Sequence, residues 1–228
     1  MRIFLSIACC LVLPSALFAQ TFSFPDLHRS ATSIADFLPP DWIIKDSVSG
    51  DLNGDKIPDK ALVLEYTDTV TELRPDSIEE TNKPRILLVL LWDPAKHVYR
   101  TAVQNNTFIL RASEGGMVGD PYNDGLSIKN EILLIGFDYL HGGLSYKFRF
   151  QANDFFLIGA TSYGSSPAHE NFDEWDVNFL TGKAKHTSGH LAGGKDRVEW
   201  KQIKTRSLIK MKNMKMPHEL EIFPDVFI

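Results

Sequence analysis

The chain has 228 residues, of which 43% are hydrophobic and 23% are charged, and its formal net charge is −5. This composition is typical of a globular protein with one domain, or two very small ones, and excludes a disordered or collagen-like chain. The two cysteines, Cys9 and Cys10, lie in a segment that we expect to be removed. A disulfide scaffold, a zinc finger, an iron–sulfur protein and a cysteine nucleophile are therefore excluded.

The first 19 residues resemble a secretory signal peptide in composition. Arg2 supplies the positive start, residues 3–13 are almost entirely apolar, and Ala19 puts a small residue at the predicted cleavage point. The alternative is a buried N-terminal helix or an anchor. The apolar run is too short to cross a bilayer, which needs about 20 residues, and no later segment is long enough. We therefore expect a periplasmic or extracellular bacterial protein without a transmembrane segment.

The predicted mature chain, residues 20–228, is acidic. Arg2 is the only charged residue of the predicted leader, so 23 basic residues remain against 29 acidic ones, and the net charge becomes −6. Nucleic-acid binding depends on an excess of lysine and arginine, so we expect no nucleic-acid partner. An envelope protein or a glycan is the expected kind of partner, although no motif identifies it.

The first predicted elements are a short helix and two strands. The helix covers 33–37 and is ended by Pro39-Pro40, and the strands cover 42–49 and 60–66. Between the strands, residues 51–59 read Asp-Leu-Asn-Gly-Asp-Lys-Ile-Pro-Asp. Side-chain oxygens stand at positions 1, 3, 5 and 9 of this loop, and the residue at position 7 can add its backbone carbonyl.

Such a spacing of oxygen donors suits calcium, a hard cation that takes 6–8 oxygen ligands. The loop is not an EF-hand, because strands flank it and Leu62 occupies position 12, where an EF-hand has glutamate. The alternative is a metal-free Asx turn between two strands. Three clustered carboxylates without a cation repel one another, and this favours the calcium interpretation.

The segment from Gly50 to Asp59, followed by the apolar run 61–64, resembles the calcium loop of FG-GAP/VCBS-type β repeats. More loosely, the order of loop, apolar strand and later hairpin resembles a group of uncharacterised exported bacterial proteins that have a single such loop. The resemblance implies strand–loop–strand geometry and a Ca²⁺ ion held by side chains and one carbonyl, from Asp51, Asn53, Asp55, Ile57 and Asp59. The sequence departs from the family at Lys56, where glycine is usual, and no second loop is found, which argues against a propeller.

Strands and turns continue after this loop. Residues 67–84 are polar and acidic and are expected to form a solvated loop, whereas 85–92 form a strongly apolar strand. Residues 97–104 alternate as a returning strand, and 112–125 form a glycine-rich loop. The clearest hairpin covers 144–163, where Leu144, Tyr146, Phe148 and Phe150 alternate with polar residues.

A dense acidic group follows this hairpin. Glu170, Asp173, Glu174 and Asp176 surround Trp175, and His169 precedes them. Paired carboxylates beside an aromatic ring can form a glycosidase site, so a carbohydrate-active hydrolase is the alternative function. Charge runs of this kind are more often solvated surface.

Two further strands and a basic tail complete the chain. The strands are predicted at 184–188 and 197–204, and the tail begins at about 207. Residues 195–215 carry a local excess of basic side chains, which could dock on an anionic surface but more simply form a solvated strand and tail.

Short strands with tight connections predict a single, mainly β domain over 20–228. We expect an antiparallel sheet or sandwich built of hairpins, with at most one or two short helices. The favoured function is that of an exported, non-enzymatic protein, a binding or envelope-associated module with a structural Ca²⁺ loop. No catalytic residue or organic cofactor is expected for that function.

Overall fold

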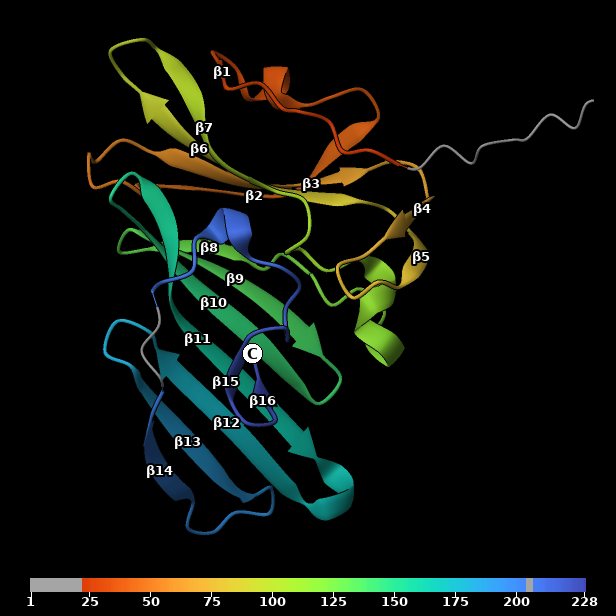
Figure 1. Cartoon of the computed structure of the whole chain (residues 1–228), viewed down its shortest axis with the longest axis vertical. Coiled ribbons are helices and arrows are strands. Elements are labelled where there is room, and N and C mark those ends of the chain that lie inside the picture. The colour runs from red at the N-terminus through yellow and green to blue at the C-terminus, as the bar shows by residue number, and fades with distance from the viewer. Residues whose placement is uncertain (1–21, 204–206) are drawn as a thin grey trace, which may run out of the picture.

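A computed structural model describes residues 22–203 and 207–228 (Figure 1). The chain is mainly β, with two large antiparallel sheets, two small hairpins and four short 3₁₀ segments in the described residues. The predicted fold class is thus confirmed. The expected leader and the two cysteines lie outside the described residues. Within them, no helix combines the length and apolarity needed to cross a membrane.

The first sheet has five strands. Their order is β1 (Ser30–Ala31), β7 (Val98–Asn105), β6 (Arg85–Asp93), β3 (Asp59–Tyr66) and β2 (Trp42–Gly50). Residues 85–91 of β6 are all buried, and the side chains of β3 and β6 divide between two apolar clusters, one on each face of the sheet. A strand buried on both faces reads as an unbroken apolar run, as 86–92 does.

The second sheet has seven strands that follow chain order. They are β8 (Leu126–Lys129), β9 (Ile132–Tyr139), β10 (Gly142–Gln151), β11 (Asp154–Ser166), β12 (Asn171–Asn178), β13 (Lys183–His190) and β14 (Arg197–Gln202). The predicted hairpin is β10–β11, with its turn at Ala152 and Asn153, both of positive φ. Leu144, Tyr146 and Phe148 are buried, as their alternation indicates.

The main core lies between the two sheets. It joins Val63 and Val89 of the first sheet to Phe137 and Tyr146 of the second. Phe108, from the segment that connects the sheets, packs edge-on against Phe137 and Tyr146, with ring centroids 5.7 and 5.0 Å apart. A smaller cluster covers the outer face of the first sheet with residues from the N-terminal segment.

That N-terminal segment contains the predicted helix as a 3₁₀ segment, η1 (Ile34–Phe37). Ser33 caps it by accepting the Ala35 N–H, and the Asp36 side chain accepts the Ser33 N–H in return. Phe37 is fully buried in the smaller cluster. The segment therefore shields β3 and β6 from water on the side away from the second sheet.

The residues after 207 pack against the second sheet rather than extending from it. They form η4 (Met211–Asn213) and a hairpin of β15 (Glu221–Phe223) and β16 (Val226–Phe227), which lies in front of the sheet in Figure 1. Met211, Met214 and Ile228 are buried in the main core. The basic tail expected from the sequence is therefore part of the folded domain in its described residues.

The structure corrects the expectation that residues 67–84 form a loop. Instead of a solvated loop they form a hairpin of β4 (Val70–Leu73) and β5 (Glu79–Asn82). Glu72 is buried and pairs with the fully buried Arg111, with Arg111 Nε 2.6 Å from Glu72 Oε1. Arg74 pairs in the same way with Glu114 of η2 (Ala112–Val118). The polar composition of this hairpin indicated exposure, and most of its residues are exposed, but ion pairs with a distant segment bury the side chains of Glu72 and Arg74.

Candidate functional site

The loop 51–59 joins β2 to β3 at the place where the two sheets meet. Gly50, the last residue of β2, approaches β8 so closely that an added side-chain carbon would lie 2.8 Å from the Ile128 methyl group. Glycine is needed there because any larger residue would push the strands apart. The loop is thus held at the contact between the first and the second sheet.

Asp51 organises the first half of the loop through its carboxylate. Oδ1 accepts the N–H groups of Asn53 and Gly54 at 3.2 and 2.7 Å, and Oδ2 accepts that of Lys56 at 2.8 Å. Gly54 and Lys56 have positive φ values of 83° and 66°, which fold the chain around the carboxylate. The turn is therefore formed by one side chain and two left-handed residues.

Asn53 and Asp55 continue the same pattern. The Asn53 side-chain oxygen accepts the Asp55 N–H at 3.0 Å, and Asp55 Oδ1 accepts the Ile57 N–H at 2.8 Å. The Asn53 amide also donates to Asp55 Oδ2 at 3.1 Å. Backbone N–H groups thus orient each of the first three side chains proposed as ligands, while lone pairs remain on their oxygens.

Asp59 closes the loop from inside the protein. It is fully buried, and its two oxygens accept the N–H groups of Leu52 and Trp92, each at 2.9 Å. Burial raises the pKa of the Asp59 carboxyl above its ordinary value of 3.8, the two hydrogen bonds oppose this shift, and the charges of Asp55 and Asp51 add to it. Asp59 therefore fastens the loop to the end of β6, a role that the spacing of the motif does not reveal.

A further carboxylate reaches the loop from the second sheet. Glu131 lies in the β8–β9 turn, where Asn130 and Glu131 both have positive φ. Its carboxylate faces Gly54, with Oε2 3.7 Å from the position that a side-chain carbon on that glycine would take. No local pattern predicts that Glu131 is a neighbour of the loop, because it is distant in the chain.

The donor set fits an oxygen-seeking cation only in part. In residues 22–203 and 207–228, no three histidine, cysteine, aspartate or glutamate side chains converge as metal ligands. A cation in this loop would therefore depend on the Asn53 amide oxygen and the Ile57 carbonyl as well as on carboxylates. No ion pair within the described part of the chain involves Asp51, Asp55 or Asp59, so their charges are not offset by basic side chains.

The acidic group at 170–176 is divided between the two faces of one strand. Asp173 lies on the same face of β12 as Trp175 and contacts His186 Nε2 at 2.5 Å. Glu174 and Asp176 alternate with these residues and point to the opposite face. Glu170 precedes the strand in a left-handed turn, and His169 contacts Ser166. The structure does not bring the four carboxylates together.

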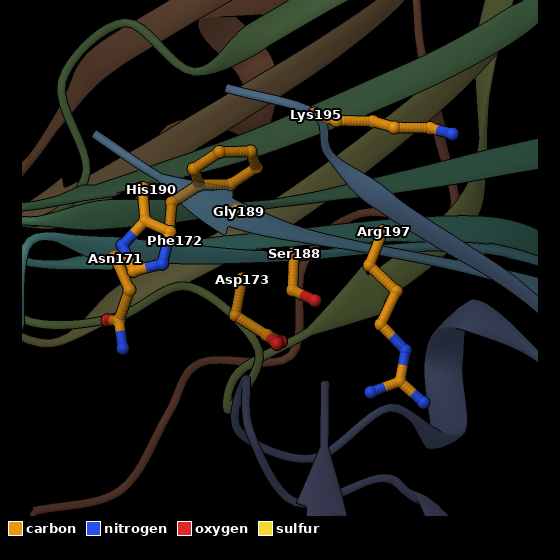
Figure 2. A pocket seen from close by; sticks show the side chains of 8 residues that line it. All are labelled: Asn171, Phe172, Asp173, Ser188, Gly189, His190, Lys195 and Arg197. Atoms are coloured by element: carbon orange, nitrogen blue, oxygen red, sulfur yellow. The ribbon is translucent and has the colours of Figure 1, made fainter. Parts of the chain in front are cut away.

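A shallow depression of about 410 Å³ lies where β12 begins and β13 ends (Figure 2). Asp173, Ser188 and Arg197 point to the same side of it, whereas Lys195 points elsewhere. Asp173 is the one member of the acidic group among its lining residues. The depression therefore lacks the second carboxylate that glycoside hydrolysis requires.

The fold and the loop together define a mainly β protein with an oxygen-rich turn where its two sheets meet. Comparison of the chain with protein-family models, with curated proteins and with solved structures finds no match.

Proposed function

We propose that this chain is an exported, non-enzymatic binding or envelope-associated protein in which the loop 51–59 binds Ca²⁺ as a structural ion. The ligands are the side chains of Asp51, Asn53, Asp55 and Asp59 and the carbonyl of Ile57, as in the FG-GAP/VCBS-type loop that the sequence resembles. The observation that carries the proposal is the buried Asp59 carboxylate, which also experiences the negative charges of Asp55 and Asp51 in the same loop.

The electrostatics of the loop support a cation. A buried carboxylate is costly unless an opposite charge or several hydrogen bonds compensate it. Asp59 has two backbone hydrogen bonds, but it also experiences the negative charges of Asp51 and Asp55. A divalent ion among these oxygens would turn the repulsion into attraction, which is the physical advantage of calcium over a metal-free Asx turn.

The position of the loop supports a structural role. Asp59 joins the loop to β6 through Trp92, and Glu131 faces the loop from the β8–β9 turn. An ion bound here would stabilise the contact between the two sheets. The five proposed ligands all come from the one turn between β2 and β3, so the role we propose for the ion is to hold this turn rather than to act on a substrate.

Exposed apolar residues support the binding part of the proposal. Met117 is 89% exposed, and it lines a hollow of about 450 Å³ together with Tyr139, Leu140, Tyr163 and His218. Grouped exposed apolar side chains are typical of interaction sites. Their partner would be an envelope protein or a glycan, since the predicted leader directs the chain out of the cytoplasm.

The experiment is calcium-dependent thermal unfolding of the purified protein. We expect the melting temperature to rise with millimolar Ca²⁺ and to fall on chelation, since a ligand at about 100 times its dissociation constant stabilises the native state by about 2.7 kcal/mol. Asp51→Ala and Asp55→Ala should abolish the rise. Mg²⁺ should be less effective because it demands stricter octahedral geometry.

Asp76→Ala is the matched control. Asp76 caps the β4–β5 turn by accepting the Ile78 N–H at 3.0 Å, and it lies outside the loop 51–59. This variant should keep the full response to Ca²⁺. If Asp51→Ala and Asp55→Ala respond to calcium as strongly as the Asp76 control, the calcium proposal is wrong.

The hydrolase alternative receives no comparable support. It needs two carboxylates in one cleft, and β12 directs Asp173 to one face and both Glu174 and Asp176 to the other. A chromogenic glycoside assay with Asp173→Asn would test it directly.

A further inference from the structure

The last strand of the seven-stranded sheet has one edge without a partner among the described residues. β14 (Arg197–Gln202) pairs only with β13 (Lys183–His190), and it is the outermost strand in Figure 1. Five of its six residues are exposed, including Trp200 at 68%. An open edge of this length is a template for pairing with another strand.

The register of the β13–β14 pair shows which backbone groups are free. Ile203 donates its N–H to the Gly182 carbonyl at 2.8 Å, in continuation of the regular ladder. In an antiparallel sheet, the N–H and C=O groups of one residue both point to the neighbouring strand on one side, and those of the next residue both point to the other side. Arg197, Glu199 and Lys201 therefore bond to β13. The residues with outward N–H and C=O groups are Val198, Trp200 and Gln202.

We propose that β14 pairs in antiparallel fashion with β14 of a second copy of this chain, centred on Trp200. The two seven-stranded sheets would then form one continuous sheet across a twofold axis perpendicular to its plane. A rotation about this axis leaves each copy's sheet with the same face turned to the same side of the joined sheet. Side chains that face one another across the junction therefore come from the same face in both copies.

Symmetry and charge select the register. Pairing centred on Glu199 would place Glu199 opposite itself and Arg197 opposite Lys201, and every one of these contacts is repulsive. Pairing centred on Val198 would match Arg197 with Glu199, but it would oppose Lys195 to Lys201 and would shorten the overlap. Both registers are therefore disfavoured.

Pairing centred on Trp200 places Glu199 of each copy opposite Lys201 of the other. These two attractive pairs are symmetric, and they occur at the positions between outward hydrogen bonds, where facing side chains of antiparallel strands lie closest. The three outward-facing residues, Val198, Trp200 and Gln202, all lie within the overlap. Charge complementarity and hydrogen bonding thus agree on one register.

This arrangement would also bury apolar side chains of β14. Trp200 and Val198 are 68% and 49% exposed, and both lie on the face of the sheet opposite Trp175. In the dimer the two Trp200 rings would lie beside each other across the axis. Aromatic cross-strand pairs stabilise antiparallel sheets, and the pairing would cover apolar surface that a single copy leaves in water.

The test is a charge exchange measured by sedimentation velocity over about a hundredfold range of concentration. Glu199→Lys places a lysine at position 199 of one copy opposite Lys201 of the other, and Lys201→Glu places Glu199 opposite a glutamate at position 201. Each variant alone should therefore have a dimer dissociation constant roughly tenfold higher. An equimolar mixture of the two should form heterodimers, because every facing pair is again of opposite charge.

The control is Lys129→Glu on β8, an exposed position at the opposite edge of the same sheet that makes the same charge change as Lys201→Glu. It should leave dimerisation unchanged. Near-ultraviolet circular dichroism checks that each variant is folded, since Lys201 also lies 4.9 Å from the Trp175 ring.

Trp200→Pro provides a second variant that does not depend on charge. Proline removes the outward N–H of residue 200 without removing a bond to β13, so it should abolish the dimer and preserve the fold. A protein that is monomeric at all concentrations, or a dimer that all these substitutions leave intact, overturns the proposal. Stronger dimerisation of Lys201→Glu alone would also overturn it, because only the two rejected registers predict that result.

Discussion

At the scale of single residues, Lys56 shows how the loop 51–59 departs from its expected pattern. It has a φ of 66°, and its N–H donates to Asp51 Oδ2 at 2.8 Å. A left-handed conformation costs a non-glycine residue about 1–2 kcal/mol. The hydrogen bond to Asp51 opposes this cost, so the loop keeps its turn although residue 56 is not glycine.

We therefore expect Lys56→Gly to stabilise the fold by about 1 kcal/mol or less, since it relieves strain. We also expect it to strengthen the calcium binding that we propose, since it removes a positive charge. Urea unfolding in chelator and in Ca²⁺ measures the two effects. Lys56→Ala is the control, because it removes the charge and retains the strain. A less stable Lys56→Gly protein would show that the lysine side chain contributes contacts that outweigh the strain.

Arg111 is a second residue whose contribution to stability depends on its surroundings. It is fully buried, pairs with Glu72, and also donates to the carbonyls of Asn106 and Ile109. Burial lowers the pKa of Arg111, against the raising effect of its hydrogen bond with Glu72. Removing one partner of such a pair leaves the other charge buried and alone.

Arg111→Met should therefore destabilise the protein by about 3–5 kcal/mol, and the double variant Arg111→Met/Glu72→Leu should recover a large part of that loss. Equilibrium urea unfolding of the two single variants and the double variant tests this prediction. Additive losses would mean that the two side chains do not act as a pair.

At the scale of elements, Asp154 holds the segment after residue 207 against the second sheet. Its Oδ2 lies 2.9 Å from Lys210 Nζ and 3.2 Å from Lys212 Nζ, at the first residue of β11. Burial acts to raise the pKa of Asp154, but these hydrogen bonds and that of the Phe155 N–H outweigh it and lower the pKa below 3.8. A carboxyl with a lowered folded-state pKa stabilises the fold above its unfolded value and loses this contribution as the pH falls through the folded value.

Asp154→Asn should thus reduce stability near neutral pH by about 1 kcal/mol or less, since both lysines are partly exposed. The difference from the unmodified protein should shrink once the pH falls below 3.8, the ordinary value for this carboxyl. Unfolding measured across this pH range tests the prediction. A constant difference at every pH would assign the effect to packing instead of charge.

At the scale of the whole molecule, the two sheets share one continuous core. Val89 from the first sheet and Trp175 from the second belong to the same cluster of buried residues, to which Met211 from the C-terminal segment also contributes. A core shared in this way couples the stability of its parts, so neither sheet should unfold alone.

We expect a single unfolding transition. Trp42 in the first sheet and Trp175 in the second are 8% and 7% exposed, so each is a suitable fluorescent reporter when the other tryptophans are replaced by phenylalanine. The two reporters should give coincident urea midpoints. Separate midpoints would show that the sheets are independent domains.

Local sequence patterns were sufficient to predict the short-range features of this protein. The alternation over 144–150 predicted β10, the apolar run 86–92 predicted β6, and Ser33 with Pro39-Pro40 bounded η1, because side-chain periodicity, capping and proline act within a few residues. The carboxylates and amide of the loop 51–59 were visible for the same reason. They form the short-range hydrogen bonds of a turn between two strands.

Contacts between groups that are distant in the chain could be seen only in the folded structure. It buried Glu72 against Arg111 in a segment expected to be solvated, bound Asp59 to the Trp92 N–H, and placed Glu131 over Gly54. It also divided the acids of β12 between two faces and left the edge of β14 without a partner among the described residues. These outcomes depend on contacts between residues far apart in the chain, and local composition and spacing carry no information about such contacts.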